Sequence, residues 1–289
     1  MKVLVTGAHG MLGYEVVTAC QLSGHEVVAT DIAFEEDFLD ITDPDSIRVA
    51  LRSVRPEWVI NCAAYTNVDA CEDHKEEAEN LNARAPALLA LLCREHSMRL
   101  LHVSTDYVFD GSKGSPYTEH DTPNPINAYG RSKLEGEGAI ARQMDDHLII
   151  RTQWLFGLHG KNFVSTIIEK AQERRSLRVV DDQWGSPTYA RDLAKAMVLL
   201  MEVDARGVYH VCNRGRTTWY NLARKAIEIF AIETEVIPVS TQEIPRPAKR
   251  PCYAVLSTKK FTKTTGKLMQ PWQISLKQYA QEYLQHSRK

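Results

Sequence analysis

The chain has 289 residues, enough for one large domain, or a main domain with a smaller lobe, and for a sizeable core. Its formal net charge of -2 gives no electrostatic case for binding nucleic acid or an anionic membrane surface. No apolar run reaches transmembrane length, and the chain opens on a strand pattern without a signal peptide. We therefore expect a cytoplasmic protein that binds neither nucleic acid nor membrane.

The cysteines and histidines point to neither disulfides nor a metal site. The six cysteines are scattered without a Cys-x-x-Cys pair, and the ten histidines show no ligand spacing. In a chain of this length, that pattern is typical of reduced thiols.

The first thirty residues alternate strand, turn, helix and strand. Residues 2–6 predict a short buried strand, 14–22 a helix and 26–30 a second strand, closed by Asp31. The turn holds three glycines at intervals of three, namely Gly7, Gly10 and Gly13. Such a turn lets a pyrophosphate approach the N–H groups at the helix start, and Asp31 is placed to bond adenosine ribose hydroxyls. A turn without a ligand is the alternative, but the flanking strand and helix are the context that the dinucleotide motif requires.

The alternation continues to about residue 151. Further strands are predicted from Trp58, at 99–104 and at 148–151, with a long helix at 76–96. Strands spaced by helices predict an α/β protein with a Rossmann-type, doubly wound parallel sheet. Residues 1–151, with returning segments, would form the NAD(P)-binding domain.

Polar and small residues follow four of these strands, where ligands bind in such sheets. They are Asp31, Ala64-Tyr65-Thr66, Ser104-Thr105 and the 151–154 segment. Because these ends converge on one crevice, together they indicate a site more strongly than any single motif.

Tyr129-Gly130-Arg131-Ser132-Lys133 supplies the chemistry. A tyrosine and a lysine four positions apart share one helix face, and an ammonium beside a phenol favours the phenolate. We predict that Tyr129 donates a proton to a carbonyl oxygen during hydride transfer, and that Lys133 lowers its pKa and bonds the nicotinamide ribose. Ser104 or Thr105 would orient the carbonyl, and we assign Thr105. The alternative for both hydroxyls is capping of a strand end.

Seven segments together resemble the dTDP-4-dehydrorhamnose reductase family, within the extended short-chain dehydrogenase/reductase superfamily. They are Gly7-x-x-Gly10-x-x-Gly13, residues 63–69, residues 104–111, Tyr129-x-x-x-Lys133, residues 151–154, Asn162-Phe163 and residues 182–188. The resemblance runs over essentially the whole chain. It implies reduction of the C4 ketone of dTDP-4-dehydro-6-deoxy-L-mannose to dTDP-L-rhamnose, for rhamnose-containing polysaccharides, with NADPH or NADH.

The resemblance also implies binding residues. The cofactor would contact Gly7, Gly10, Met11, Leu12, Gly13, Asp31, Asp40, Ile41, Ala64, Tyr65, Thr66, Val103, Tyr129 and Lys133. The sugar nucleotide would contact Thr105, Asp106, Tyr129, Trp154 and Arg250.

One departure from the family pattern bears on assembly. Some members dimerise through a magnesium ion held by acidic side chains, and Glu15 matches one of those positions. Arg191 stands where those members carry a second acid, and a cation there opposes a divalent metal. We therefore expect no structural metal, a monomer or weak homodimer without a bridging metal, and Glu15 as a surface helix residue.

Residues 152–289 are predicted to form mainly a smaller α/β lobe that binds the sugar nucleotide. Helices are expected at 163–173, 190–202 and 219–230, with short strands near 178–180, 208–211 and 236–239. The loop 245–251 carries Arg246, Lys249 and Arg250, either for a diphosphate or as a solvated charge run. Trp154, directly after a strand, is a better candidate than Trp184 for flanking the sugar or the thymine.

Two other functions remain open. One is reduction or epimerisation of another nucleotide-linked deoxysugar on the same scaffold. The other is a non-catalytic role like that of the relative that serves as a regulatory subunit of methionine adenosyltransferase, although such a protein need not retain Tyr129 and Lys133. For the cofactor, Asp31 favours NADH, because a 2′-phosphate would face its carboxylate. NADPH also remains open, because the resembled family often accepts both.

Overall fold

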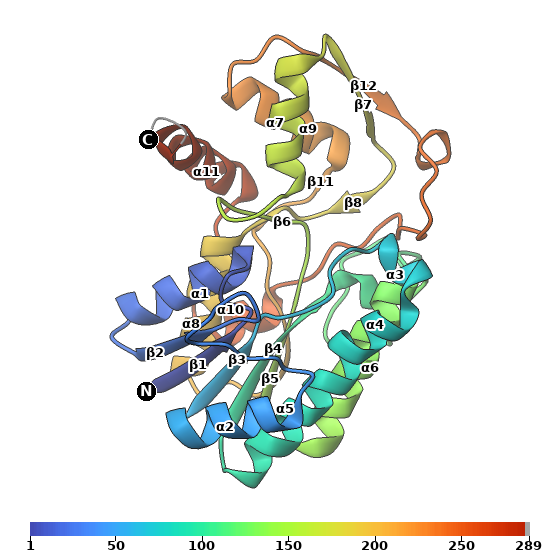
Figure 1. Cartoon of the computed structure of the whole chain (residues 1–289). Coiled ribbons are helices and arrows are strands. Elements are labelled where there is room, and N and C mark those ends of the chain that lie inside the picture. The colour runs from blue at the N-terminus through green and yellow to red at the C-terminus, as the bar shows by residue number, and fades with distance from the viewer. Residues whose placement is uncertain (287–289) are drawn as a thin grey trace.

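The main body is built on one parallel sheet of six strands, seen in the lower half of Figure 1 in a computed structural model that describes residues 1–286. The strand order is β10-β5-β4-β3-β1-β2, and every neighbouring pair is parallel. The strands are β1 (Lys2–Thr6), β2 (Glu26–Thr30), β3 (Trp58–Asn61), β4 (Arg99–Thr105), β5 (His147–Thr152) and β10 (Gly207–His210). The order reverses at β1, and a ligand crevice is expected where it does.

Helices cover both faces of this sheet because its strands are apolar on both sides. Val3 and Val5 of β1 pack toward α1 and α8, whereas Leu4 packs toward α2, α5 and α6. The helices are α1 (Met11–Leu22), α2 (Pro44–Val54), α5 (Ala85–Glu95), α6 (Ala128–Gln143) and α8 (Ala190–Glu202). The predicted Rossmann-type fold class is confirmed.

The helix predicted at 76–96 is interrupted by a π-helical turn. It runs as α4 (Lys75–Glu79), the π-helix η1 (Asn80–Arg84) and α5. Pro86 has no N–H to donate to the carbonyl of Asn82, so the ordinary helical bond is missing there. The Asn82 carbonyl is approached instead by Gly136 of α6, where a Cβ would lie 2.2 Å from that oxygen.

Late segments return to the sheet. β10 pairs with β5, and α8 packs against α1. Within residues 1–286, three helices of seven or more residues were not predicted: α2, α10 (Lys259–Thr265), which packs on α8 and β10, and α11 (Trp272–His286).

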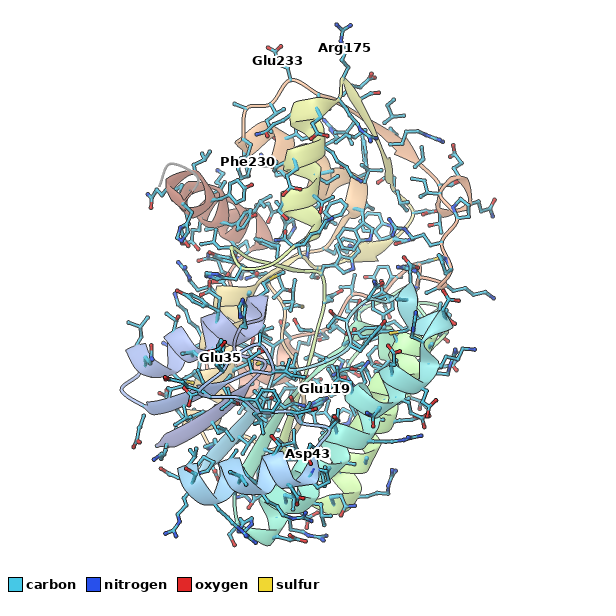
Figure 2. All side chains as sticks on the ribbon, in the orientation of Figure 1. Glu35, Asp43, Glu119, Arg175, Phe230 and Glu233 are labelled. Carbon is cyan, nitrogen blue, oxygen red and sulfur yellow. The ribbon has the colours of Figure 1, made fainter. Side chains whose placement is uncertain are left out.

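The remaining segments form a smaller lobe above the sheet in Figure 1. Its core includes Phe156, Tyr189 and Tyr279, and Figure 2 shows Arg175 and Glu233 pointing outward at its far end. Its helices are α7 (Phe163–Glu173), α9 (Trp219–Ile229) and α11, with β7 (Ser176–Val180) parallel to β12 (Glu235–Val239). The short elements of the chain are α3 (Ala70–Asp73), η2 (Asp106–Val108), β6 (Leu155–Phe156), β8 (Trp184–Gly185), β9 (Thr188–Tyr189), β11 (Thr217–Thr218) and η3 (Thr241–Glu243).

Glu15 is not the surface residue that we expected. It is 2 % exposed, because the face of α1 that carries it packs against α8. Nε of Arg191 donates to Glu15 Oε2 at 3.1 Å, and Arg191 also pairs with Glu282 of α11. A guanidinium therefore bridges two carboxylates here, tying α1 and α8 to the last helix.

Residues 1–286 contain neither a cluster of metal ligands nor a membrane-spanning helix. No group of three or more His, Cys, Asp or Glu side chains in this range is arranged to hold a metal ion. No helix in the same range combines the length and the apolar character needed to cross a bilayer.

Candidate active site

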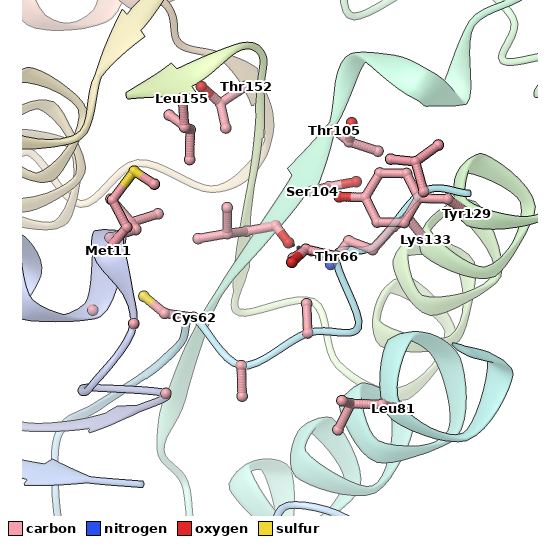
Figure 3. Close-up of a pocket in the computed structure, with 18 of the residues that line it drawn as sticks. Met11, Cys62, Thr66, Leu81, Ser104, Thr105, Tyr129, Lys133, Thr152 and Leu155 are labelled. Carbon is pink, nitrogen blue, oxygen red and sulfur yellow. Dashed lines mark hydrogen bonds between the residues drawn. The ribbon is translucent and has the colours of Figure 1, made fainter. Parts of the chain in front are cut away.

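A cavity of about 980 Å³ opens at the carboxyl ends of β1, β3, β4 and β5 and extends to the smaller lobe. Figure 3 shows Tyr129, Ser104 and Thr105 together on one side and Met11 and Leu155 on the other. Every predicted site residue except Tyr65 lines it: Gly7, Gly10, Met11, Leu12, Gly13, Asp31, Asp40, Ile41, Ala64, Thr66, Val103, Thr105, Asp106, Tyr129, Lys133, Trp154 and Arg250.

The glycine turn is shaped for close approach by a ligand. Gly7 has a positive φ of 67°, which favours glycine. A Cβ on Gly13 would lie 2.0 Å from the carbonyl oxygen of Gly7, so the turn closes tightly on the start of α1. The N-terminal N–H groups of α1 thus face the cavity, and a helix start of this kind suits a phosphate.

Asp31 closes the same end of the cavity. Its Oδ2 accepts from the His9 N–H at 2.9 Å, and its Oδ1 accepts from the Ala33 N–H at 3.0 Å. These two bonds fix the carboxylate between the glycine turn and the segment after β2, where an adenosine ribose would lie.

We expect Asp31→Ala to narrow any preference for NADH over NADPH by about 10-fold, because the charge-assisted bond to the ribose and the repulsion of a 2′-phosphate are both lost. The measurement is the ratio of kcat/KM values for the two cofactors. Losing the bond to His9 would loosen the turn for both cofactors alike, so only the ratio isolates the ribose contact. Asp31→Asn is the size-matched control, and an unchanged ratio in both variants would show that Asp31 does not discriminate.

Tyr65 takes a different place from the other predicted residues. It does not line the cavity, and its ring packs against the apolar cluster of Cys71, Ala78 and Ala128, which Tyr129 also contacts. Its backbone is clamped by Asn82, which accepts from the Tyr65 N–H at 2.9 Å and donates to the Tyr65 carbonyl at 3.0 Å. Asn82, on the π-helical turn, therefore holds the backbone between the lining residues Ala64 and Thr66, a role that no motif in the sequence predicted.

Tyr129 lies in the first turn of α6, directly over the end of β4. Asn127 caps the helix by accepting from the Gly130 N–H at 2.8 Å. Gly130 is required for space, because a Cβ there would lie 2.1 Å from the carbonyl oxygen of Tyr107. Burial raises the pKa of Tyr129 above its usual value, the Asp106 carboxylate raises it further, and a hydrogen bond with Thr105 opposes both.

The amine of Lys133, which the sequence predicts to act on Tyr129, is bonded to groups of β4 in the free protein. Its Nζ bonds to the Val103 carbonyl at 2.6 Å and lies 3.0 Å from Nε2 of His102. Burial lowers the pKa of Lys133 to about 8, although Glu137 and Cys62 act in the opposite direction. In this structure the lysine is therefore committed to β4, and Thr105 is the partner that favours the phenolate.

The two candidate hydroxyls after β4, those of Ser104 and Thr105, have different hydrogen-bond partners. Ser104 donates its hydroxyl to Oε1 of Glu137 at 2.5 Å, deep against α6. Thr105 caps η2 by accepting from the Tyr107 N–H at 3.1 Å, and it lies beside Tyr129. Of the two, Thr105 is the hydroxyl placed to act together with the phenol.

Asp106 is a buried acid in the cavity wall. It is 1 % exposed, and its Oδ2 has no hydrogen-bond partner among the described residues. Burial raises the pKa of Asp106 to about 7, although hydrogen bonds from Thr105 and the backbone oppose the shift. An acid of this kind can donate or accept a hydrogen bond near neutral pH.

We expect Asp106→Asn to stabilise the free protein at pH 8 by about 3 kcal/mol and to change little at pH 4. In the folded protein the pKa of Asp106 is about 7. Below the unfolded pKa the protonated acid therefore costs the fold no stability. The free energy of unfolding falls as pH rises from there, and the loss is complete once pH has passed 7. Urea unfolding at both pH values is the measurement, and an equal effect at both would contradict it. Asp110→Asn should show the opposite sign, because hydrogen bonds from Ser112 and Asn124 lower the pKa of Asp110.

Two stacked tryptophans form the wall toward the smaller lobe. Trp154 has a positive φ of 49°, and its ring stacks on Trp219 at a centroid distance of 3.5 Å and an angle of 12°. Gly185 leaves room for the Trp154 ring, because a Cβ there would lie 2.4 Å from it. Trp184 does not line the cavity; it is 38 % exposed, with Arg216 beside its ring. Trp219 was not predicted as a site residue, because it reads only as a helix start.

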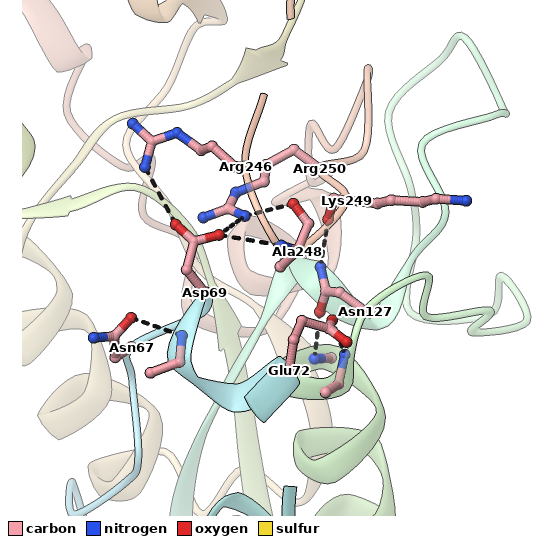
Figure 4. A network of polar contacts seen from close by, with 11 residues as sticks. Asn67, Asp69, Glu72, Asn127, Arg246, Ala248, Lys249 and Arg250 are labelled. Atoms are coloured by element: carbon pink, nitrogen blue, oxygen red, sulfur yellow. Dashed lines mark hydrogen bonds and ion pairs between the residues drawn. The ribbon is translucent and has the colours of Figure 1, made fainter. Parts of the chain in front are cut away.

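The cations of the loop 245–251 differ in how they contact Asp69 (Figure 4). Arg250 donates to Asp69 Oδ1 at 2.5 Å and lines the cavity, whereas Arg246 bonds Oδ2 at 3.3 Å and is exposed. Lys249 is exposed, and its side chain points away in Figure 4. Burial would raise the pKa of Asp69, but hydrogen bonds from Arg250 and Ala248 outweigh it and lower that pKa. Of the three cations, Arg250 alone lines this cavity.

A parallel sheet of this order, a glycine turn at its switch point and a Tyr-x-x-x-Lys helix beside the crevice define a Rossmann-fold protein of the short-chain dehydrogenase/reductase class. The chain belongs to the family described as the RmlD substrate binding domain, whose model matches residues 1–285. The resemblance found in the sequence is confirmed.

Three proteins illustrate the similarity. The dTDP-4-keto-6-deoxy-D-glucose reductase of Streptomyces niveus is 42 % identical over 255 residues, 88 % of this chain and 87 % of the relative. A crystal structure of a dTDP-4-dehydrorhamnose reductase from Clostridium acetobutylicum is 39 % identical, covers 99 % of this chain and 100 % of its own, and has a TM-score of 0.93. The dTDP-4-dehydrorhamnose reductase of Bacillus anthracis in complex with NADP is 35 % identical, covers 97 % and 99 %, and has a TM-score of 0.92.

Proposed function

We propose that the chain is an NAD(P)H-dependent reductase of the C4 ketone of dTDP-4-dehydro-6-deoxy-L-mannose, producing dTDP-L-rhamnose for rhamnose-containing polysaccharides. One observation carries the proposal: Thr105, Tyr129 and Lys133 line the same cavity as the glycine turn. A proton donor and a dinucleotide cradle in one cavity suit hydride transfer to a carbonyl.

The residues at the β1 end fit a nicotinamide dinucleotide. The turn from Gly7 to Gly13 and the start of α1 would hold the pyrophosphate, and Asp31 would hold the adenosine ribose. Asp40, Ile41, Ala64 and Val103 would line the path toward the nicotinamide, which supplies the hydride when bound. The Bacillus anthracis relative binds NADP, and Asp31 favours NADH, so we propose that either cofactor serves.

At the β4 end, the chain's own groups handle the proton. Thr105 orients the ketone oxygen, and Tyr129 gives its phenolic proton to that oxygen as the C4 alcohol forms. Asp106, with an unpartnered Oδ2, is placed to bond a sugar hydroxyl. Burial favours the protonated phenol of Tyr129, which is the form that a proton donor requires.

The nucleotide end would lie toward the smaller lobe. The Trp154 ring offers a flat surface to the sugar or the thymine, and Arg250 offers a cation to the diphosphate. Residues 1–151 with β10 and α8 would thus bind the cofactor, and the rest of 152–289 would bind the sugar nucleotide.

A second candidate is the corresponding reduction of dTDP-4-keto-6-deoxy-D-glucose. The relative at 42 % identity carries that activity in its name. Both substrates present a C4 ketone to the same pair of hydroxyls, so the difference lies in the sugar contacts rather than in the proton donor.

The deciding experiment follows NADH and NADPH oxidation by the purified protein on each of the two ketosugars, with products identified by NMR. We expect turnover of the L-mannose derivative to dTDP-L-rhamnose. Preferential turnover of the D-glucose derivative would favour the second candidate. Cofactor binding without turnover of either would point to another ketosugar or to a regulatory role, and cofactor that co-purifies and stays bound through turnover would point to an epimerase.

We further propose a cytoplasmic protein that acts as a monomer or weak homodimer without a bridging metal. All six cysteines are unpaired, as expected in a reducing compartment. Arg191 occupies the space beside Glu15 where a cation would otherwise bind. Sedimentation equilibrium with and without a chelator tests the assembly, and a dimer that dissociates with the chelator would overturn it.

A further inference from the structure

A row of buried polar side chains crosses the sheet directly behind Lys133. Strand register places Thr6 of β1 opposite Asn61 of β3, and Asn61 opposite His102 of β4. All three are at most 1 % exposed, and Lys133 is 2 % exposed. Each neighbouring pair in the row Thr6, Asn61, His102, Lys133 lies within hydrogen-bond distance, at 2.7, 3.0 and 3.0 Å. Because these side chains are shielded from bulk solvent, their donors and acceptors have to match one another.

The orientation of the Asn61 amide is fixed by the backbone. The Ala63 N–H points at Asn61 Oδ1 at 3.1 Å, and an N–H can only donate. The Thr6 hydroxyl donates to the same oxygen. The Asn61 amide nitrogen therefore faces Nδ1 of His102, and since an amide nitrogen accepts nothing, Nδ1 has to be the acceptor.

This assignment decides the proton on the other side of the ring. A neutral imidazole that accepts at Nδ1 carries its proton on Nε2, and that N–H points at Lys133 Nζ. An ammonium group has three donors and no lone pair, so it would set two donors against each other. A neutral amine accepts from Nε2–H through its lone pair, donates one N–H to the Val103 carbonyl and keeps one N–H for the cavity.

We infer that His102 is a positioning residue for Lys133: in the free protein it carries its proton on Nε2, favours the neutral amine of the lysine over the ammonium, and holds the lysine turned to β4 rather than to Tyr129. The inference deepens the proposed function, on which its catalytic meaning rests. Lys133 has to gain a proton before it can stabilise the phenolate of Tyr129, so His102 helps to set the pH range in which the lysine acts.

The charged and titratable groups around Lys133 agree with this arrangement. On its own helix, Glu137 favours the ammonium, but it is paired with Arg151 of β5 at 2.6 Å. After β3, Cys62 is held as a thiol, because burial raises its pKa to about 12. Burial is the main cause that lowers the pKa of His102 well below its usual value, and a charge on Lys133 lowers it further. The ring is therefore neutral whichever form the lysine takes.

Nitrogen and carbon NMR of the free protein test the inference without any substrate or cofactor. In wild type, we expect His102 to carry its proton on Nε2 alone at pH 9, where Lys133 is mostly the neutral amine, and Lys133 to titrate at least two units below an ordinary lysine. Lys133→Met identifies the lysine signal. A proton on Nδ1, or a Lys133 pKa near 10, would overturn the inference.

Two replacements set an acceptor opposite Lys133 in place of the N–H of His102. His102→Gln can turn an amide oxygen toward Nζ, so the pKa of Lys133 should rise by one unit or more, a tenfold change in its protonation equilibrium. Asn61→Asp gives Nδ1 an acceptor, so the His102 proton should move to Nδ1 and Nε2 should accept from the ammonium. Its added charge also raises the lysine pKa, so the position of the His102 proton is the decisive readout for this variant.

His210→Gln is the matched control, because His210 is equally buried, at the end of β10, and bonds the Tyr117 carbonyl instead. It should leave the Lys133 pKa unchanged. An unchanged Lys133 pKa in folded His102→Gln would overturn the inference, and so would an unmoved proton in Asn61→Asp if the first variant fails to fold. Because these readouts need no turnover, a failure of the proposed function would appear separately, as absence of activity in a wild-type protein with the expected proton positions.

Discussion

Replacing Tyr129 with phenylalanine should lower kcat by about 10²- to 10⁴-fold, the usual contribution of a positioned proton donor. The ring would keep its place over the end of β4, where it packs edge-on against Tyr107 at 5.6 Å, so the cavity should keep its shape. Only the proton to be delivered to the ketone oxygen is lost. Steady-state kinetics on the accepted ketosugar, with cofactor affinity measured by fluorescence titration, gives both quantities.

A matched variant tests whether the loss of activity comes from this proton donor or from removing any buried tyrosine hydroxyl. Tyr209 of β10 is a buried tyrosine outside the cavity lining, and its hydroxyl lies 3.2 Å from that of Thr264. Tyr209→Phe should therefore keep kcat within a few-fold of wild type. Full activity in Tyr129→Phe would remove Tyr129 as the donor, and an equal loss in both variants would indicate damage to the fold instead.

Replacing Arg151 with methionine should destabilise the fold by about 3–5 kcal/mol, because it leaves Glu137 as a buried charge without its partner. Both side chains of this pair are 5 % exposed, and the guanidinium contacts both carboxylate oxygens. The pair joins β5 to the helix that carries Tyr129 and Lys133. Urea unfolding of the free protein at pH 7.5 is the measurement.

The paired replacement gives the control. Arg151→Met combined with Glu137→Leu removes both charges and should recover most of the lost stability, since an apolar pair of similar volume often replaces a buried ion pair without loss. Ser104 would lose its acceptor in the double variant, at a cost of about 1–3 kcal/mol. A single variant as stable as wild type would show that water or another cation reaches Glu137.

The sequence predicted those parts of the fold that depend on local pattern. α7, α8 and β1 have the predicted bounds, because their apolar residues follow a clear period, and Asn162 also caps the start of α7. α11 was missed because its polar residues interrupt the helical stripe, and the apolar face of the helix becomes evident only against Phe156 and Tyr189. Pro86 is a sequence signal for the π-helical turn, but the helical period of the apolar residues on both sides predicted one continuous helix.

For the candidate site, all but one of the residues given by the motifs and by the family resemblance line the cavity, whereas their side-chain partners could not be predicted. The direction in which Lys133 points depends on His102, and the place of Arg250 depends on Asp69, which lies 181 positions earlier. Contacts of this kind are set by strand register and loop packing. The place of the Tyr65 ring could not be predicted for the same reason, since a residue between two lining residues can lie outside the lining.

The Trp154–Trp219 stack gives the protein a built-in optical reporter. The two indoles lie nearly parallel at 3.5 Å, close enough for their electronic transitions to couple. Trp154 lies two residues after the end of β5 and Trp219 begins α9, so the coupling joins the sheet to the smaller lobe. A ligand that shifts one ring against the other would therefore change the near-ultraviolet circular dichroism of the unlabelled protein, and the change would follow the geometry of the joint between the two parts rather than the chemistry in the cavity.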